Sequence, residues 1–388
     1  MKKLIFKLFL ILLSFGFILN VFPTFTAHAI ENEPSIENQI TAKSGLLIDY
    51  HSGKVLFEKN ANERLPIASM TKLASLAVVF DAIEKGVVKE NEYVVVSETA
   101  AAVGGSSAFL DARSSYKVAD LIKTIVVASA NDSTVALAEH IAGSEELFVS
   151  RMNSFARDLH LNDTNFVNST GLPCENHYSS AFDIANIYKT ICNNSIYKKF
   201  AKIWMEDFIH PSGRKTGLVN TNRLVKTYDG IEGGKTGYTD LARFCLTASA
   251  TRGNLRLIGV IIGANDSKTR FSEMSKLFNF GFANYENKCV VNSEIATTVT
   301  KFKSAKDPVN IYAERDSYML LQKGSDEVYS TDYQLNDIKA PLKSGDVVGK
   351  LFIFDKNNMV IDEINLIIKN DVGAVGVKES IKKIVEIW

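Results

Sequence analysis

The residues best suited to chemistry in this chain are Ser69 and Lys72, which stand at the head of an apolar segment. Apolar residues recur at helical spacing from Leu73 to Ile83. A serine and a lysine three positions apart fall on the same side of such a helix, about 5–6 Å apart at Cβ. Burial favours the neutral form of a lysine, and a neutral amine can take the proton of a serine hydroxyl. The spacing therefore predicts a serine nucleophile with a lysine base.

The Ser-x-x-Lys pattern alone is not specific. It occurs five times, beginning at Ser69, Ser114, Ser195, Ser212 and Ser380. For any one copy, a solvated serine and lysine is the commoner reading, because both residue types are mostly exposed. Only the first copy heads a strongly apolar segment that would draw its lysine into the interior. This context favours Ser69.

A second polar cluster, Ser129 and Asn131, separates two apolar helical patterns at 118–127 and 134–142. Serine and asparagine between two buried helices either belong to a site or cap a helix, since both are good N-caps. The sequence leaves both readings open.

A third candidate is the Lys-Thr-Gly triplet that begins at Lys235. Two β-like runs follow it, at 244–250 and 255–263, so the triplet is expected on or beside a strand, where a lysine can be held rigidly. Another Lys-Thr-Gly triplet begins at Lys215, in a polar turn, and is expected to be a solvated loop. His177, in an irregular segment, is interpreted as a structural histidine bonded to backbone.

The elements that must position these residues follow from periodicity and turn signals. We expect a hairpin over 44–57 and a small all-β region over 288–370. The expected helices are 69–85 (ending at Gly86), 118–127, 134–142, 145–159, 180–191, 197–204 and 276–285.

Composition bounds the class of protein. With 388 residues, 46% hydrophobic and 23% charged, the chain is long enough for two domains with a substantial core. Its formal charge of zero gives no sign of nucleic-acid binding. The four cysteines match no zinc spacing, and both disulfides and free thiols stay open: Cys174, Cys192, Cys245 and Cys289.

The two ends of the chain carry targeting signals. Three lysines, an apolar run over 8–22 and Ala27-His28-Ala29 are typical of a secretory signal peptide, here 1–29, so the mature protein is expected outside the cytoplasm, at the outer face of the membrane or in the cell wall. At the other end, one helical face collects Val377, Ile381, Ile384, Val385 and Trp388. We expect residues 372–388 to be an amphipathic membrane-anchor helix, with docking on the β domain as the alternative.

Taken in order, Ser69-x-x-Lys72, Ser129-x-Asn131 and Lys235-Thr236-Gly237 form a motif set shared by β-lactamases and penicillin-binding proteins. The sequence resembles the low-molecular-mass penicillin-binding proteins, the serine-type D-alanyl-D-alanine carboxypeptidases. The matching stretches are 66–72, 128–132, 166–172, 221–224, 234–239 and 338–342. The resemblance implies a serine β-lactamase/transpeptidase-like α/β (α+β) domain over 30–286, an antiparallel sheet packed with a helical cluster. It also implies a small all-β domain over 287–371.

The resemblance also implies roles. There would be three catalytic residues. Ser69 would be the nucleophile, Lys72 its base and Ser129 the proton relay. The substrate-binding residues would be Asn131, Lys235, Thr236, Gly237, Tyr238 and Arg270. The backbone amides of Ser69 and Tyr238 would form the oxyanion hole. The implied partners are stem peptides ending in D-Ala-D-Ala, β-lactam antibiotics as acylating inhibitors and a membrane surface, without metal, cofactor or nucleic acid.

Two positions depart from the family pattern, and two other functions compete. Ala130 and Arg243 stand where the family usually or often has glycine; the second is expected to affect packing near the site. A secreted serine β-lactamase is the first alternative, but no Glu-x-x-Leu-Asn that would position a deacylating water lies between Asn131 and Lys235. A non-catalytic penicillin-sensing module is the second, disfavoured because the nucleophile and base are both present. No Gly-x-Ser-x-Gly or His-Glu-x-x-His occurs to support other hydrolases.

Overall fold

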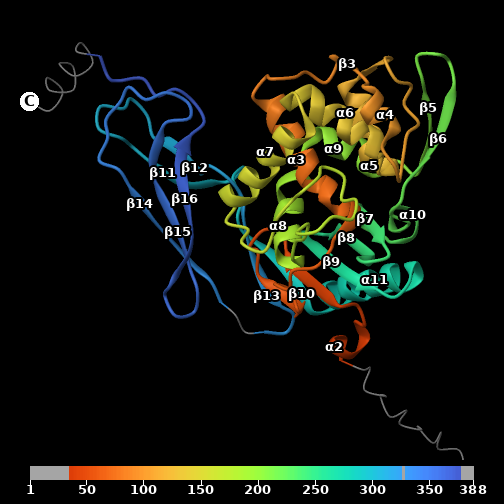
Figure 1. The fold of residues 1–388 in the computed structure, drawn as a ribbon. Helices are drawn as coiled ribbons and strands as arrows, with labels where there is room; N and C mark the ends of the chain where they lie inside the picture. Colours follow the sequence, from red (N-terminus) through yellow and green to blue (C-terminus); the bar gives the residue numbers. More distant parts are fainter. Residues whose placement is uncertain (1–34, 326–327, 377–388) are drawn as a thin grey trace, which may run out of the picture. The chain divides into compact units, whose positions relative to one another are not determined.

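The structure is a computed structural model, and it describes residues 35–325 and 328–376 (Figure 1). The expected signal peptide and the residues from Val377 onward lie outside the described part of the chain. Within that part, no helix is both long enough and apolar enough to cross a membrane. The first residues of the expected anchor are not helical, because Val372 bridges to Leu342 and Ala374 to Ala305.

The N-terminal part is built on a five-stranded antiparallel sheet in the order β2-β1-β9-β8-β7. Its strands are β1 (Ser44–Asp49), β2 (Val55–Lys59), β7 (Ile231–Thr239), β8 (Arg243–Arg252) and β9 (Leu255–Ala264). Strand β1 pairs with β9 across more than 200 positions of sequence, with Leu46 opposite Val260. The first hairpin thus becomes one side of the sheet that carries the second Lys-Thr-Gly triplet.

Every residue of β9 is buried. Because successive side chains of a strand point to opposite faces, both faces of β9 are covered. Ile258, Val260 and Ile262 belong to the core of the helical cluster. On the other face, Gly259 lies against Met274 of α11 (Ser267–Asn284). The expected antiparallel sheet with helical packing is confirmed.

The helical cluster contains the predicted helices with small shifts of boundary. It comprises η1 (Ala68–Thr71), α3 (Lys72–Glu84), α4 (Glu98–Ala102), α5 (Val118–Ala128), α6 (Asn131–Ala142), α7 (Glu145–Asp158), α8 (Ala181–Ile191), α9 (Ser195–Ala201) and α10 (Leu224–Thr227). A further short helix, α2 (Ile36–Gln39), precedes β1 in the chain. Helix α11 begins nine residues before the predicted start at Lys276. Its N-cap is Asp266, whose carboxylate accepts the amide of Thr269, and periodicity alone did not indicate this cap.

Two short hairpins stand apart from the main sheet. One pairs β3 (Tyr93–Val95) with β4 (Ser115–Lys117), and the other pairs β5 (Met205–Ile209) with β6 (Lys215–Val219). The expectation that the Lys215 triplet is a loop was wrong, since Lys215 pairs with Ile209 in a regular antiparallel ladder. The triplet is largely exposed, so its polar composition reflects solvent and not the absence of a strand.

The C-terminal part is all β, as predicted. It pairs β10 (Tyr285–Val291) with β13 (Ser317–Gln322) and forms a second five-stranded sheet in the order β11-β12-β16-β15-β14. That sheet contains β11 (Ala296–Thr300), β12 (Val309–Ala313), β16 (Val360–Ile368), β15 (Val347–Phe354) and β14 (Ser330–Leu335). The domain boundary expected between 286 and 287 falls inside β10.

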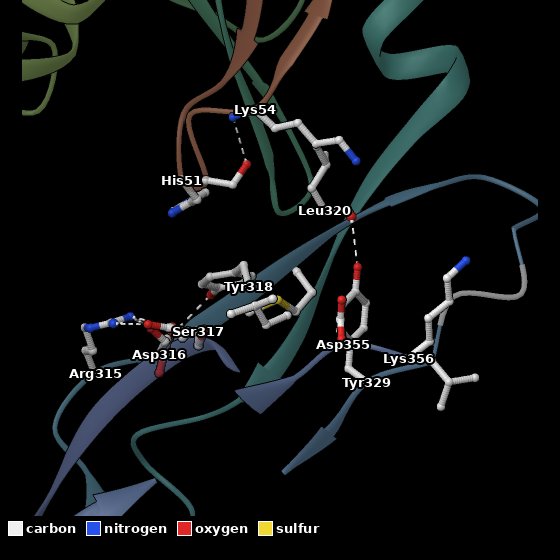
Figure 2. A pocket seen from close by; sticks show the side chains of 15 residues that line it. His51, Lys54, Arg315, Asp316, Ser317, Tyr318, Leu320, Tyr329, Asp355 and Lys356 are labelled. Carbon is white, nitrogen blue, oxygen red and sulfur yellow. Dashed lines mark hydrogen bonds and ion pairs between the residues drawn. The ribbon is translucent and has the colours of Figure 1, made fainter. Parts of the chain in front are cut away.

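The turn between β1 and β2 meets this C-terminal part at β10 and β13. Asn287 Nδ2 donates to Asp49 Oδ1 at 2.8 Å, and the rings of His51 and Tyr318 lie 5.0 Å apart. Figure 2 shows the residues that line the cavity beside them. The cavity has a volume of about 650 Å³ and is lined by the turn and by residues 315–320, 328–329, 355–356 and 361–362.

Candidate active site

Ser69 is positioned by a tightly packed turn. Ala68, just before it, has φ +47°, in the left-handed region that L-residues seldom adopt. A Cβ on Gly171 would lie 2.0 Å from Ala68 O, and a Cβ on Gly237 would lie 2.6 Å from Ile67 O. Only glycine at both places lets the two neighbouring segments approach so closely. The nucleophile is therefore fixed by its backbone as well as by its helix.

Lys72 opens α3 and is fully buried. Its Nζ lies 3.1 Å from Ser69 Oγ and donates to Thr170 O at 2.7 Å. Burial holds the pKa of this amine well below its usual range, and the charge of Lys235 lowers it further. The arrangement places an amine whose neutral form is favoured by burial next to the serine hydroxyl, and a lysine must be neutral to act as a general base.

The structure decides against capping at Ser129 and Asn131. Ser129 ends α5 with φ +65°, and its Oγ accepts a hydrogen bond from Lys235 Nζ at 2.7 Å. The N-cap of α6 is Ala130, with no side-chain cap. Asn131 instead donates Nδ2 to Gly104 O at 2.6 Å, and its buried Oδ1 has no partner in the described chain. Neither side chain caps a helix, and Ser129 lines the cavity described below.

Lys235 lies on β7, as predicted, and is almost completely buried. Besides Ser129, its Nζ donates to Thr236 O at 3.0 Å. Burial, and then the charge of Arg270, lower the pKa of Lys235 to about 7. Tyr238, at the other end of the motif, is half exposed and donates its hydroxyl to Asp240.

Arg270 comes from α11 and reaches the same strand. Its Nη1 donates to Gly237 O at 3.2 Å and to Cys245 O at 3.1 Å. Its Nε is buried without a partner in the described residues, and burial lowers the pKa of the guanidinium to about 10. A buried cation with spare donors and only neutral partners is suited to an anionic ligand.

These side chains open into a cavity of about 760 Å³. Most of the candidate residues line it directly, as do others that the sequence did not single out: Ser69, Ser106, Ser129, Trp204, Thr221, Arg223, Lys226, Thr236, Gly237, Tyr238 and Arg270. No aspartate or glutamate is among the lining residues. The site thus combines an activated serine with a wall that carries only positive charge.

His177 is the structural residue that the sequence suggested. Its Nδ1 accepts the backbone amide of Val167 at 3.1 Å, so the other nitrogen carries the proton and donates to Thr71 Oγ1 at 2.7 Å. Burial lowers its pKa to about 4, which keeps the ring neutral. His177 thus connects two segments of the site. One begins at Val167 and contains Thr170, whose carbonyl accepts from Lys72, and the other is the helical turn that contains Ser69 and Thr71.

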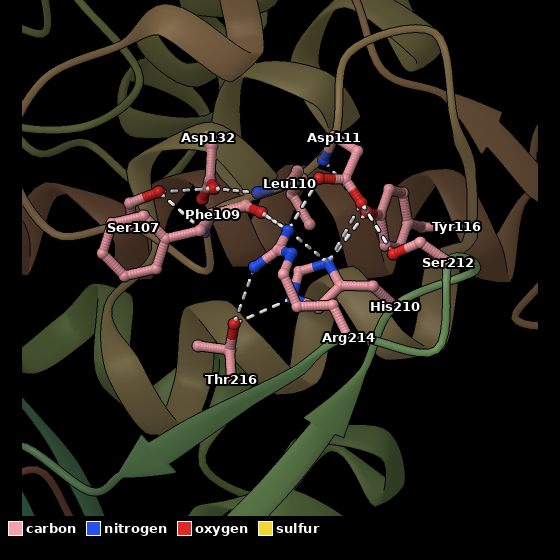
Figure 3. Close-up of polar contacts among 10 residues, drawn as sticks. All are labelled: Ser107, Phe109, Leu110, Asp111, Tyr116, Asp132, His210, Ser212, Arg214 and Thr216. Carbon is pink, nitrogen blue, oxygen red and sulfur yellow. Dashed lines mark hydrogen bonds and ion pairs between the residues drawn. The ribbon is translucent and has the colours of Figure 1, made fainter.

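Sequence reasoning missed the buried carboxylate of Asp132, which holds the loop 107–110 beside the site. It accepts hydrogen bonds from Ser107 Oγ at 2.6 Å and from the amide of Leu110 at 3.0 Å (Figure 3). It also accepts from the amide of Ala108 at 3.1 Å. An aspartate one position after Asn131 reads only as a helix-start residue, so no signal in the sequence identified its distant partners.

Arg243 and the cysteines can now be placed. Arg243 has φ +57°, which explains why glycine suits this position, and its guanidinium donates to Asn265 O. The four cysteines are free in this structure, and burial raises the pKa of Cys192 and Cys245 to about 11.

Comparison with known proteins covers both halves of the chain. A family model described as D-alanyl-D-alanine carboxypeptidase matches residues 28–266, and a model of the penicillin-binding protein 5 C-terminal domain matches residues 285–374. D-alanyl-D-alanine carboxypeptidase DacF of Bacillus subtilis is 38% identical over 350 residues, 89% of this chain and 90% of that protein. DacC of Escherichia coli is 34% identical over 363 residues, 91% of this chain and 88% of that protein. The crystal structure of penicillin binding protein 5 from Haemophilus influenzae, 34% identical, covers 86% of this chain and 98% of its own with a TM-score of 0.68.

Proposed function

The chain belongs to the D-alanyl-D-alanine carboxypeptidase family of serine hydrolases, and we propose that it removes the terminal D-alanine of peptidoglycan stem peptides through an acyl-enzyme on Ser69. The observation that carries this mechanism is the 3.1 Å approach of Ser69 Oγ to a fully buried Lys72 amine. Penicillin, whose binding is typical of the family, would acylate the same oxygen.

In the first step Lys72 takes the hydroxyl proton while Ser69 Oγ bonds to the carbonyl carbon between the two D-alanines. The carbon–nitrogen bond then breaks, and Ser129 relays a proton to the departing amine of D-alanine. A water molecule attacks the ester, which releases the shortened peptide and restores the serine. The bond from Lys235 Nζ to Ser129 Oγ supports this relay, because it fixes the position of the hydroxyl.

Charge that develops on the carbonyl oxygen would be stabilised by the backbone amides of Ser69 and Tyr238, with each such donor contributing about 3–4 kcal/mol in acyl transfer. The close approach of β7 supports this assignment, since a Cβ on Gly237 would lie 3.2 Å from Ser69 N. The peptide would lie along Gly237 and Tyr238 and accept or donate hydrogen bonds at Asn131.

The terminal carboxylate would be held by Lys235, Thr236 and Arg270. Thr236 and Arg270 line the cavity, and the Nζ of the buried Lys235 donates to Ser129 Oγ, which lines it too. Neither cation has an ion-pair partner among the described residues. A fixed, uncompensated cation favours a substrate that ends in a free carboxylate over one that continues. This preference would account for cleavage at the end of the peptide, and it requires no contact between the substrate and the other residues of the cavity wall.

We further propose that the protein is exported and bound to the outer face of the membrane through its last residues. The basic, apolar and Ala-x-Ala segments of 1–29 and the apolar helical face from Val377 to Trp388 support this location. Deletion from Val377 should move the protein from the membrane fraction to the soluble fraction. Unchanged partition would contradict the anchor.

The decisive experiment incubates the mature protein with a pentapeptide ending in D-Ala-D-Ala and, separately, with labelled penicillin. Release of D-alanine and a long-lived covalent adduct are expected, and both should vanish in Ser69→Ala. An adduct without D-alanine release would point to a sensor, and rapid turnover of penicillin would point to a β-lactamase.

A further inference from the structure

Two cations that the mechanism above does not use line the active-site cavity. Arg223 directly precedes α10 and Lys226 lies on it, and both are exposed. Neither forms an ion pair within the described chain, although Lys226 Nζ lies 5.6 Å from the ring centroid of Trp204, which lines the same cavity. Exposed cations that face a cavity without an acid in its wall leave their charge to a ligand.

The register of β7 places these cations beyond the leaving group. A Cβ on Gly237 would lie 3.2 Å from Ser69 N, whereas a Cβ on Gly234 would lie 2.9 Å from Asn222 Nδ2. Lys235 and Thr236 stand between those two glycines, and Asn222 is the residue before Arg223. Along β7 the order is therefore the end that contacts the nucleophile, then Lys235, and then the end that contacts the residue before Arg223.

The positive charges of Arg223 and Arg270 affect one another, and both residues line the same cavity. Burial lowers the pKa of Arg270, and the positive charge of Arg223 lowers it further, so the two guanidinium groups lie within electrostatic range. The Nε of Arg270 is buried and has no partner in the described residues. A cavity of about 760 Å³ is also much larger than a single D-alanine needs.

We infer that Arg223 and Lys226 form a second carboxylate-binding subsite, which selects leaving groups that carry a further carboxylate beyond the one held by Lys235. The inference rests on the proposed function. The bonds made and broken are unchanged: Ser69 Oγ joins the carbonyl carbon, the carbon–nitrogen bond breaks and the departing amine takes the relayed proton. Such a leaving group is either a terminal D-amino acid with an acidic side chain or a cross-linked peptide that leads on to another carboxylate.

The test uses two pentapeptides that differ in charge but not in shape, one ending in D-Ala-D-Glu and one in D-Ala-D-Gln. For the unaltered protein, kcat/KM should be about tenfold higher with D-glutamate, mainly through KM, because tenfold corresponds to one charge-assisted contact of about 1.4 kcal/mol. In the double variant Arg223→Gln, Lys226→Gln the ratio should fall to about one.

Lys202→Gln is the matched control. Lys202 is an exposed lysine two residues before Trp204 that does not line the cavity, and its removal should leave the ratio unchanged. A thermal unfolding curve for each variant shows whether it is folded. Branched peptides whose leaving amine belongs to a diamino acid, with the distal acid free or amidated, distinguish a cross-link from a linear terminus as the source.

Three results would overturn the inference while D-Ala-D-Ala is still cleaved. These are equal rates for the two peptides, cleavage of neither, and a charge preference that survives in the folded double variant. Failure to cleave D-Ala-D-Ala as well would instead overturn the proposed function, so the two failures are distinguishable.

Discussion

Two groups of charged residues lie near the loop 104–111, and their cations have different hydrogen-bond partners. In the active site, Lys235 and Arg270 bond only to hydroxyl and carbonyl oxygens among the described residues. In the second group, Arg214 donates to Asp111 Oδ1 at 2.7 Å and also to Phe109 O (Figure 3). Arg214, which joins the β5–β6 hairpin to this loop, is paired with an anion, whereas Lys235 and Arg270, the two cations proposed to bind substrate, are not. A carboxylate partner therefore distinguishes Arg214 from these two cations.

His210 belongs to the paired group. Its Nδ1 lies 2.9 Å from Tyr116 Oη and 3.1 Å from Arg214 Nη2, and its Nε2 donates to Thr216 Oγ1 at 2.8 Å. Burial, and then the charge of Arg214, lower its pKa, so the imidazole stays neutral. The group connects the β5–β6 hairpin to the loop that borders the catalytic cavity.

The largest effect should come from Lys235→Met. Loss of the buried cation should lower kcat/KM for D-Ala-D-Ala peptides by about 10³-fold, as removal of one partner of a buried charge pair does. The same change should raise the free energy of unfolding by about 1–3 kcal/mol, because an uncompensated buried charge is costly. Steady-state kinetics test the loss of activity, and denaturant unfolding tests the gain in stability. A variant less stable than the unaltered protein would contradict the view that Lys235 is an uncompensated charge.

The second-largest effect is expected at the carboxylate of Asp132. Its oxygens accept hydrogen bonds from the loop 107–110 and from Ser133 N. Asp132→Asn replaces one acceptor by an amino group that faces N–H donors. It should cost about 2–3 kcal/mol of stability. It should also slow acylation by penicillin, since Asn131 next to it loses its support. Ser107→Ala, which removes one of these donors, should cost less. An equal cost for both variants would contradict the central role of the carboxylate.

The pH dependence should separate activity from stability at Lys235. Activity requires neutral Lys72 and charged Lys235, so kcat/KM should fall about tenfold per pH unit above pH 7, where Lys235 loses its proton. The folded pKa lies below the unfolded value, so the unfolded chain binds more protons between pH 7 and 10.5, and stability should rise with pH across that window. The rise should be smaller in Lys235→Met but not absent, because burial also lowers the pKa of Lys72. An unchanged rise in this variant would show that Lys235 does not contribute to it.

The smallest effect should be at Arg214. Arg214→Met removes the bonds to Asp111 and Phe109, and because both charged partners are partly exposed it should cost only about 1 kcal/mol. The rate of penicillin acylation should change less than twofold, in contrast to the substitution at Lys235. Arg113→Met breaks the more exposed pair with Glu98 and should be nearly neutral. A catalytic defect at Arg214 would remove the distinction between the two groups.

The sequence predicted those parts of the site whose signal is local. Ser69 and Lys72 lie on one helical turn, and the β-like runs after Lys235 indicated its strand. The partners of Lys72 were not predictable, because Thr170 O is 98 positions away and a backbone oxygen has no residue type to identify it. The role of Ser129 stayed open for the same reason, since a cap and a ligand of Lys235 need the same hydroxyl.

Other features depend on tertiary contacts that override local composition. The triplet at Lys215 has the residues of a turn, but its pairing with β5 makes it a strand. The sequence analysis did not single out Arg223 and Lys226, and only the fold places them on the cavity wall. Local patterns thus identified the chemistry, whereas the surroundings that select a substrate came only from the fold.

The bond from Lys72 to Thr170 O has a consequence for measuring folding. The nucleophile becomes reactive only when the segments around residues 69–72, 129, 170 and 235 have all packed together, although they are spread over more than 160 positions. A chain that has formed its helices but not docked these segments cannot be acylated. The fraction of molecules labelled by a short pulse of penicillin during refolding is therefore a direct count of native molecules, and its time course reports the last docking event.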